Sequence, residues 1–176
     1  LFGYPRINNP ETKFKAEGEY SLKLHLPVAD CTDLMATLDA EADKAFAEAV
    51  TKNDGKNFVM VKGKKKQIER NSPYFEVLED DGETKTGMVE FKFGANATFK
   101  DKKDGDKIKP RTPPGLFDAK GKPIKVQIWS GSEGRVSYTM GPYFIPGSGA
   151  AGVKLYLEAV KGLKLVSGSG QDASRY

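Results

Sequence analysis

The sequence predicts a mainly β protein: a five-stranded, antiparallel Greek-key barrel of the OB type, with one long α-helix inserted after its first strand. Two features of the chain favour this fold class. Several segments alternate apolar and polar residues, as half-buried strands do, whereas one segment repeats apolar residues at helical spacing. Helices do not alternate with strands along the chain, so an all-parallel sheet is not favoured. A β-sandwich is the alternative.

The clearest strand is predicted at residues 89–99, within the segment GMVEFKFGANATFKDKKDGDKIK. Side chains on a strand alternate between its two faces. One parity holds Val89, Phe91, Phe93, Ala95, Ala97 and Phe99, and the other holds Glu90, Lys92, Asn96, Thr98 and Lys100. The strand leads into a turn-rich basic loop at residues 100–111. A cation-bearing face beside a basic loop would suit an extended polyanion, although a solvated hairpin explains the same residues.

Further strands are predicted at residues 19–26, 125–129, 135–140 and 153–165, with shorter extended pieces near residues 74–77 and 116–117. In the last strand Val153, Leu155 and Leu157 are expected to face inward, and a bend near residues 161–162 explains a change of parity. Residues 1–16 are expected to be irregular, because they contain two prolines and an Asn-Asn pair.

Residues 30–52 form the one predicted helix. Its apolar stripe, which would pack on a sheet, consists of Leu34, Leu38, Ala42, Ala45, Phe46 and Ala49. Asp30 or Thr32 is expected to cap the first turn, and Asn53-Asp54-Gly55 to end the helix.

Length and composition limit the classes of protein that fit. A chain of 176 residues is expected to form one domain, residues 1–166, followed by a flexible Gly/Ser-rich tail, residues 167–176. The single cysteine, Cys31, excludes an internal disulfide, and the single histidine, His25, argues against a His-ligated metal or a His-based triad. No apolar segment is long enough to span a membrane and no signal peptide is visible, so a reducing cytoplasm is expected.

The sequence offers little for catalysis. No Gly-rich loop with a Lys-Ser/Thr pair opens a helix, and no Gly-x-Ser-x-Gly stands on a strand-to-helix turn. Asp101, Asp104 and Asp106 faintly resemble a calcium loop, but the closing glutamate is missing and lysines lie between them. We therefore expect no enzyme, no cofactor and no metal, with a metal-dependent nuclease built on these aspartates as the least favoured alternative.

Binding of single-stranded nucleic acid fits the residues better, because such sites combine a basic groove that tracks phosphates with aromatic faces that stack bases. The net charge of +4 permits an anionic partner without requiring one. The candidate contacts are Lys92, Lys100, Lys102, Lys103, Lys109, Arg111, Lys125, Trp129, Arg135, Tyr143, Phe144 and Lys154.

Some interpretations stay open at this point. Trp129 is either a stacking platform or a ring with one buried edge. The run Lys64–Lys66 is either a solvated loop or a secondary phosphate-contacting patch. For the chain as a whole, the alternative function is a non-catalytic protein-interaction module whose lysines serve only solubility.

Six segments carry a family resemblance: YSLKLHLP (residues 20–27), EADKAFAEAV (41–50), FKFGANATFKDKK (91–103), FDAKGKPI (117–124), RVSYTMGPYF (135–144) and AGVKLYLEAV (151–160). In their order and spacing they resemble the single-stranded DNA-binding proteins of T7-like phages. The resemblance covers most of the chain and is strongest in its last half.

The resemblance implies an OB-fold that binds single-stranded DNA without sequence preference. It also implies coating of exposed strands in phage DNA replication and recombination, and annealing of complementary strands. Homodimerisation and contacts with the phage DNA polymerase and helicase-primase are implied as well, in the cytoplasm of the infected bacterial host.

At single residues the resemblance is partial. In that family an aromatic after a proline and a lysine of the FKF-like stretch bind DNA, and they match Tyr143 and Lys92. Two other cationic contacts are not matched, because they fall at Gly94 and at about Glu17. The family's long acidic tail is not matched either, since residues 168–176 contain no acidic run.

Overall fold

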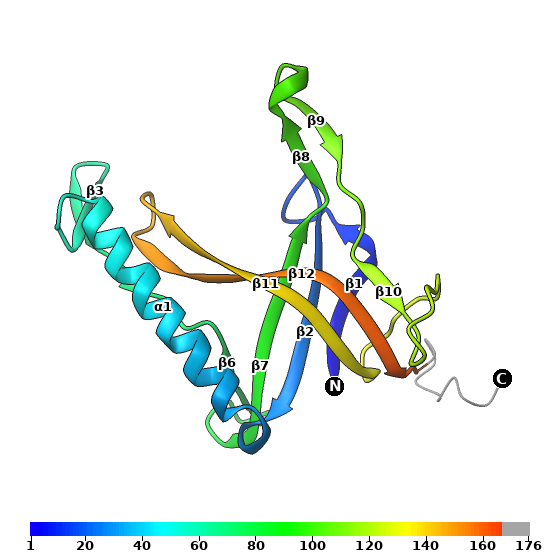
Figure 1. Cartoon of the computed structure of the whole chain (residues 1–176). Coiled ribbons are helices and arrows are strands. Elements are labelled where there is room, and N and C mark those ends of the chain that lie inside the picture. The colour runs from blue at the N-terminus through cyan, green and yellow to red at the C-terminus, as the bar shows by residue number, and fades with distance from the viewer. Residues whose placement is uncertain (167–176) are drawn as a thin grey trace. The chain divides into compact units, whose positions relative to one another are not determined.

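The computed structural model describes residues 1–166, whose helix and strands are labelled in Figure 1. The chain forms two compact units. Unit 1 comprises residues 1–25, 92–139 and those from 155 onward, and unit 2 comprises residues 26–91 and 140–154. Three long strands contribute residues to both units: β7 (Lys85–Asn96), β11 (Glu133–Ile145) and β12 (Ala150–Lys164). The last two residues of β2 also fall in unit 2. The tail predicted at residues 167–176 lies outside the described residues.

Unit 1 is built from strands. Besides its share of the three long strands it holds β1 (Phe2–Glu11), most of β2 (Glu19–Pro27) and β10 (Gly115–Phe117). The order in the sheet is β1-β2-β7-β12-β10, with β11 also paired to β12. Strands β1 and β2 are antiparallel, whereas β12 runs parallel to β7 and to β10. The sheet is therefore mixed, and the prediction that all its strands are antiparallel is wrong.

A separate hairpin of unit 1 follows β7 along the chain. It pairs β8 (Thr98–Asp101) with β9 (Lys107–Pro110), and the short 3-10 helix η2 (Lys102–Asp104) lies between them. The basic loop predicted at residues 100–111 is therefore mostly an ordered hairpin.

Unit 2 contains the helix α1 (Thr32–Lys52), which follows the 3-10 turn η1 (Val28–Asp30). Strands β3 (Phe58–Val61) and β4 (Lys64–Gln67) form a hairpin, while β5 (Glu69–Arg70) pairs with β12 and β6 (Phe75–Leu78) with β7. A buried cluster of Ala49, Val59, Ile68 and Ala151 joins the helix to these strands. Within residues 1–166, no helix is both long and apolar enough to cross a membrane.

Most of the predicted elements are present. Strands at β2, β6, β7, β10, β11 and β12 and the helix α1 lie where the patterns place them. In β7, Val89, Phe91 and Phe93 are buried and Lys92 is exposed, as the alternation predicts. Phe99 is an exception at 39% exposed, because the pairing of β7 ends before Ala97 and Phe99 belongs to the hairpin.

The helix prediction is confirmed except for its cap and its place in the order of elements, since α1 follows the second strand, β2, and not the first. The stripe residues Leu38, Ala42, Ala45 and Ala49 are buried, as their spacing predicts. However, Cys31 stands at the N-cap position, and no side chain forms a cap hydrogen bond there. The expectation that Asp30 or Thr32 caps the helix is therefore wrong.

The irregular segment predicted at residues 1–16 is also wrong, because β1 occupies most of it. Its two prolines are tolerated for a physical reason: β1 is the first strand in the sheet order, and an edge strand can leave N–H positions unpaired. The pairing with β2 is interrupted twice, between Gly3 and Arg6 and between Arg6 and Glu11. The strand thus accommodates prolines that, in the sequence alone, indicate irregular structure.

The strand predicted at residues 125–129 is absent. The side-chain amide of Asn8 takes the place of a neighbouring strand: it accepts from the Ile128 N–H at 3.1 Å and donates to the Val126 carbonyl at 2.7 Å. Ile128 is buried, but Val126 is 45% exposed, so the two do not share one buried face.

Two further predictions are refined by the structure. In β12 the buried set runs through Val153, Leu155 and Leu157 and then switches to Val160 and Gly162, so the change of parity begins before residue 161. The run Lys64–Lys66 belongs to a strand, β4, rather than a loop, and all its side chains are exposed. The ammonium of Lys65 lies 4.8 Å from the centre of the Phe58 ring.

Gly149 is tightly enclosed just before β12 begins. Its φ is +71°, and a Cβ there would lie 2.4 Å from the backbone carbonyl oxygen of Gln67. We expect G149A to lower the free energy of unfolding by on the order of 1–3 kcal/mol, because a backbone atom cannot move aside cheaply and alanine is strained at this φ. Urea denaturation followed by circular dichroism measures the change.

Gly147 provides the matched control for that experiment. It lies in the same loop, but nothing approaches its Cβ position within 4 Å. G147A should therefore leave the unfolding midpoint almost unchanged. Equal midpoints for the two variants would contradict the described loop geometry.

Candidate nucleic-acid interface

Three surface hollows of unit 1 follow one another through shared residues. The N-terminal cleft, about 430 Å³, includes Tyr4, Arg6, Phe14, Lys15, Lys23 and Lys92 in its lining. Lys15 also lines the middle hollow, together with Phe99 and Lys100. Asn96 of the middle hollow also lines the third hollow, together with Arg111 and Tyr156. We call this series of three hollows the track.

Cations outnumber carboxylates along the track. The cations are Arg6, Lys15, Lys23, Lys92, Lys100 and Arg111, and the carboxylates are Glu11, Glu17, Glu19 and Glu158. Low-dielectric walls around charges of one prevailing sign focus the field in a hollow. The track is therefore suited to an anionic chain.

Every hollow of the track also presents an exposed aromatic ring. In the N-terminal cleft Tyr4 is 74% exposed and Phe14 is 87% exposed, and Phe99 and Tyr156 are each 39% exposed. A cation lies over three of these rings: Lys23 is 5.8 Å from the centre of Tyr4, Lys13 is 5.5 Å from Phe14, and Arg111 is 5.6 Å from Phe99. Rings and cations side by side are the combination that binds single strands.

Strand geometry places the predicted cations of the track. Lys92 is directed outward because its neighbours Phe91 and Phe93 are buried on the other face of β7. Lys100 is exposed on β8. Arg111 follows β9, and its N–H donates to the Ala97 carbonyl at 2.7 Å, which fixes the backbone beside the third hollow.

The remaining cations of the β8–β9 hairpin are placed differently. Lys102 and Lys103 are exposed on η2. Lys109, in contrast, pairs with Asp101 at 2.8 Å and with Asp104 at 3.0 Å. The hydrogen bond from Lys109 holds the pKa of Asp101 below its usual value. These aspartates stabilise the hairpin, and the part of the chain that the structure describes has no group of three metal-ligating side chains.

Lys125, Trp129 and Arg135 are exposed in unit 1 without lining the track. Trp129 is 44% exposed. The next residue, Ser130, accepts a hydrogen bond on its Oγ from the Tyr4 N–H at 2.9 Å. Trp129 is therefore adjacent in sequence to Ser130, which fixes the backbone of Tyr4 in the N-terminal cleft.

Tyr143, Phe144 and Lys154 belong to unit 2, so the structure does not bring all twelve predicted residues into one compact unit. The Tyr143 hydroxyl accepts a hydrogen bond from Asn71 at 2.8 Å, and a Cβ at Gly152 would lie 3.0 Å from that hydroxyl. Phe144 packs against the core cluster of unit 2. Both rings are half-buried, which is less exposure than the sequence indicates.

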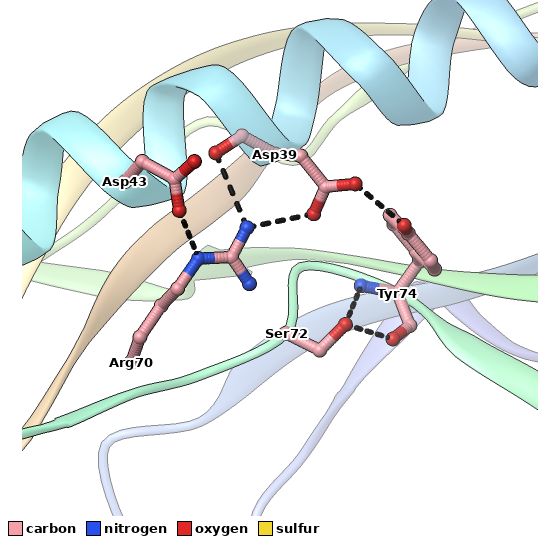
Figure 2. A network of polar contacts seen from close by, with 5 residues as sticks. All are labelled: Asp39, Asp43, Arg70, Ser72 and Tyr74. Atoms are coloured by element: carbon pink, nitrogen blue, oxygen red, sulfur yellow. Dashed lines mark hydrogen bonds and ion pairs between the residues drawn. The ribbon is translucent and has the colours of Figure 1, made fainter.

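An ion-pair network fixes the segment that carries Asn71 (Figure 2). Arg70 donates to Asp39 of α1 at 2.7 Å and also pairs with Asp43. The Tyr74 hydroxyl donates to the second oxygen of Asp39 at 2.7 Å. Hydrogen bonds from Arg70 and then from Tyr74 lower the pKa of Asp39, and the bond to Asp39 raises the pKa of Tyr74 to about 12.

Sequence reasoning missed several residues of the track: Tyr4, Arg6, Phe14, Lys15, Lys23 and Tyr156. For Lys23 and Tyr156 a signal existed, since each lies on the polar parity of a correctly predicted strand. For Tyr4 and Phe14 there was none, because their segment was expected to be irregular.

Comparison with known proteins assigns the chain to a family. A family profile described as "Single-stranded DNA-binding protein, Bacteriophage T7" matches residues 3–165. The single-stranded DNA-binding proteins of Escherichia phage T7 and Enterobacteria phage T3 are each 31% identical to the chain. In both cases the alignment covers 96% of this chain and 72% of the relative.

Solved structures agree with that assignment. The crystal structure of gp2.5, a single-stranded DNA binding protein encoded by bacteriophage T7, superposes with a TM-score of 0.74 at 28% identity, covering 95% of this chain and 91% of that one. The single-stranded DNA-binding protein of bacteriophage Enc34 in complex with ssDNA shares the fold, with a TM-score of 0.58 at 13% identity and coverage of 92% and 80%.

The chain therefore belongs to the family of single-stranded DNA-binding proteins typified by that of bacteriophage T7. Its fold is the mainly β OB-fold with one inserted helix, as the sequence predicts.

The network in Figure 2 makes a testable contribution to stability. We expect D39N to lower the free energy of unfolding at pH 7 by about 1 kcal/mol, because the carboxylate is 38% exposed and solvent screens part of its interactions. Because the pKa of Asp39 is lower in the folded chain than its ordinary value of 3.8, the ionised carboxylate stabilises the fold fully above that ordinary value. This stabilisation is lost as the pH falls through the pKa that Asp39 has in the folded chain. Urea unfolding at pH 7 and at about pH 3 measures both effects.

E48Q is the control on the same helix, since Glu48 forms only an exposed pair with Lys52 at 3.9 Å. It should change stability little at either pH. If D39N lowered the free energy of unfolding as much at about pH 3 as at pH 7, the ionised carboxylate of Asp39 would not be the source of the stabilisation.

Proposed function

We propose that the chain binds single-stranded DNA along the track of unit 1, without sequence preference and without catalysis. The observation that carries this proposal is the presence of exposed aromatic rings and cations together in three hollows that share residues. The relatives from phages T7 and T3 are single-stranded DNA-binding proteins by name, which supports the same ligand.

The proposed mechanism divides the strand between two kinds of contact. Lys92, Lys100 and Arg111 attract phosphates, which makes affinity depend steeply on salt. The rings of Phe99 and Tyr156 stack on bases, at about 1–3 kcal/mol per base. Neither contact reads the edge of a base, so every sequence binds similarly.

The same division favours single strands over duplex. Bases of a duplex are already stacked and paired, so their faces are not available to the rings of the track. Phosphates of a duplex remain available to the cations. We therefore infer a weak, salt-sensitive affinity for duplex and a stronger one for single strands.

The other candidate residues have graded roles in this proposal. Exposed Lys102, Lys103, Lys125, Trp129 and Arg135 would make flanking contacts in unit 1. Lys109 would contribute less, because Asp101 and Asp104 already neutralise it. Tyr143, Phe144 and Lys154 would form a second group of contacts, made by unit 2.

At the level of the phage, we infer that the chain coats exposed single strands during DNA replication and promotes annealing and recombination. Its site of action would be the cytoplasm of the infected host. Contacts with the phage DNA polymerase and helicase-primase, and a homodimer, belong to the same proposal. The second candidate, a protein-interaction module whose lysines serve only solubility, leaves unexplained why cations line the same hollows as the exposed rings.

A salt titration tests the proposal directly. Anisotropy of a labelled oligo-dT should show binding that weakens steeply between about 50 and 200 mM salt. K92A and R111A should each weaken binding at low salt. Each should also reduce the slope of log affinity against log salt by about 0.7 for every phosphate that is no longer neutralised.

K44A serves as the control, since Lys44 is an exposed cation on α1 in unit 2. It should leave both affinity and slope unchanged. Absence of binding at low salt would overturn the proposal in favour of the protein-interaction module.

A further inference from the structure

We propose that the N-terminal cleft is a base-stacking site, in which nucleobases lie against Tyr4 and Phe14. The inference rests on the proposed binding of single-stranded DNA and deepens it. It assigns additional stacking contacts to a segment that the sequence predicts to be irregular.

The exposure of the two rings is the first argument. Tyr4 is 74% exposed and Phe14 is 87% exposed, more than any other large hydrophobic residue in the described part of the chain. Both line one hollow of about 430 Å³. Apolar surface gathered in a concave, partly charged site is typical of ligand binding rather than of chance exposure.

The backbone at Tyr4 is the second argument. Its φ is +44°, which is unfavourable for a bulky residue, and it precedes a proline. Between the pairs Gly3–Lys23 and Arg6–Ser21, β1 has one residue more than β2, which is a β-bulge. Bulges redirect side chains and occur beside functional sites. The Tyr4 N–H is held in this conformation by the Oγ of Ser130.

The loop that carries Phe14 is also held in place. In this loop the backbone N–H of Gly18 donates to the backbone carbonyl of Lys15 at 2.8 Å. The backbone carbonyl of Gly18 accepts from the backbone N–H of Ala97 at 3.0 Å. The Lys15 ammonium donates to Asn96 at 2.7 Å. Phe14 is therefore exposed on an anchored loop, which lowers the ordering cost of binding.

Charges in the cleft separate bases from phosphates. Lysines lie over both rings, where they can attract the phosphate of a nucleotide whose base is stacked nearby. Glu11 and Glu19 face each other across β1 and β2 and also line the cleft. Glu11 also pairs with Arg6 of the same cleft at 3.6 Å. A carboxylate has no hydrogen to donate to a phosphate, so this part of the cleft suits a base better than the phosphate of a nucleotide.

The test compares two ligands of equal charge: oligo-dT and an oligonucleotide of the same length made of abasic nucleotides. The wild-type chain should bind oligo-dT more tightly at low salt. Y4A and F14A should each weaken binding of oligo-dT by about 5-fold or more, as expected when one base no longer stacks on a ring. Neither should change binding of the abasic strand by more than about 2-fold, since that strand has no base to stack.

F75A is the matched control, because Phe75 is a 58% exposed aromatic on β6 in unit 2. It should bind both ligands as the wild type does. Thermal unfolding of each variant checks that the fold is intact, and Y4F, which keeps the ring, should retain the wild-type preference for oligo-dT.

The outcomes separate the two proposals. If the wild type binds neither ligand, the proposed function fails. If it binds oligo-dT but Y4A and F14A bind it equally well, the stacking site fails and the track stands. Equal losses of affinity for oligo-dT and for the abasic strand would likewise overturn the inference, because the rings would then be supporting phosphate contacts.

Discussion

The register of β12 is the constraint on which much of the structure depends. This strand pairs with β7 through Leu155 and Tyr156, with β10 through residues 159–161, and with β5 through Ala150 and Ala151. Its buried residues alternate with outward ones, so a slip of one residue would bury Tyr156 and expose Leu157. Because buried Leu155 pairs with buried Phe93, the same register leaves Lys92 on the outward face of β7. The pairing of β12 with β7 thus determines that both the Tyr156 ring and the Lys92 ammonium lie on the outward side, where they line the track.

Local patterns were sufficient for the elements whose side chains alternate or repeat cleanly. The alternation in β7 and β12 and the apolar stripe of α1 predicted both the elements and their buried faces. Residues 1–16 and 125–129 differ from their predicted structure because their conformation depends on contacts far away in the chain. The Asn8 amide holds the backbone at Val126 and Ile128 across about 120 residues of sequence. A sequence pattern carries no signal of such a bond.

The same limit applies to the binding site. Cations on or after predicted strands, such as Lys92 and Arg111, could be found because strand parity or loop position exposes them. Tyr4 could not, since its outward direction depends on a bulge and on Ser130. Tyr143 and Phe144 looked exposed beside a glycine-rich loop, yet Gly152 makes room for one ring and the core cluster receives the other. Glycines near aromatics can therefore indicate close packing as readily as a ligand-facing rim.

The most direct test of the account is to identify which residues touch the strand. An oligonucleotide containing 5-bromodeoxyuridine can be crosslinked to the protein by light, and the modified residues located by mass spectrometry. Crosslinks should concentrate on aromatic residues of the track, at Tyr4, Phe14, Phe99 and Tyr156. Crosslinks confined to α1 or to the β3–β4 hairpin, with none on the track, would contradict the account.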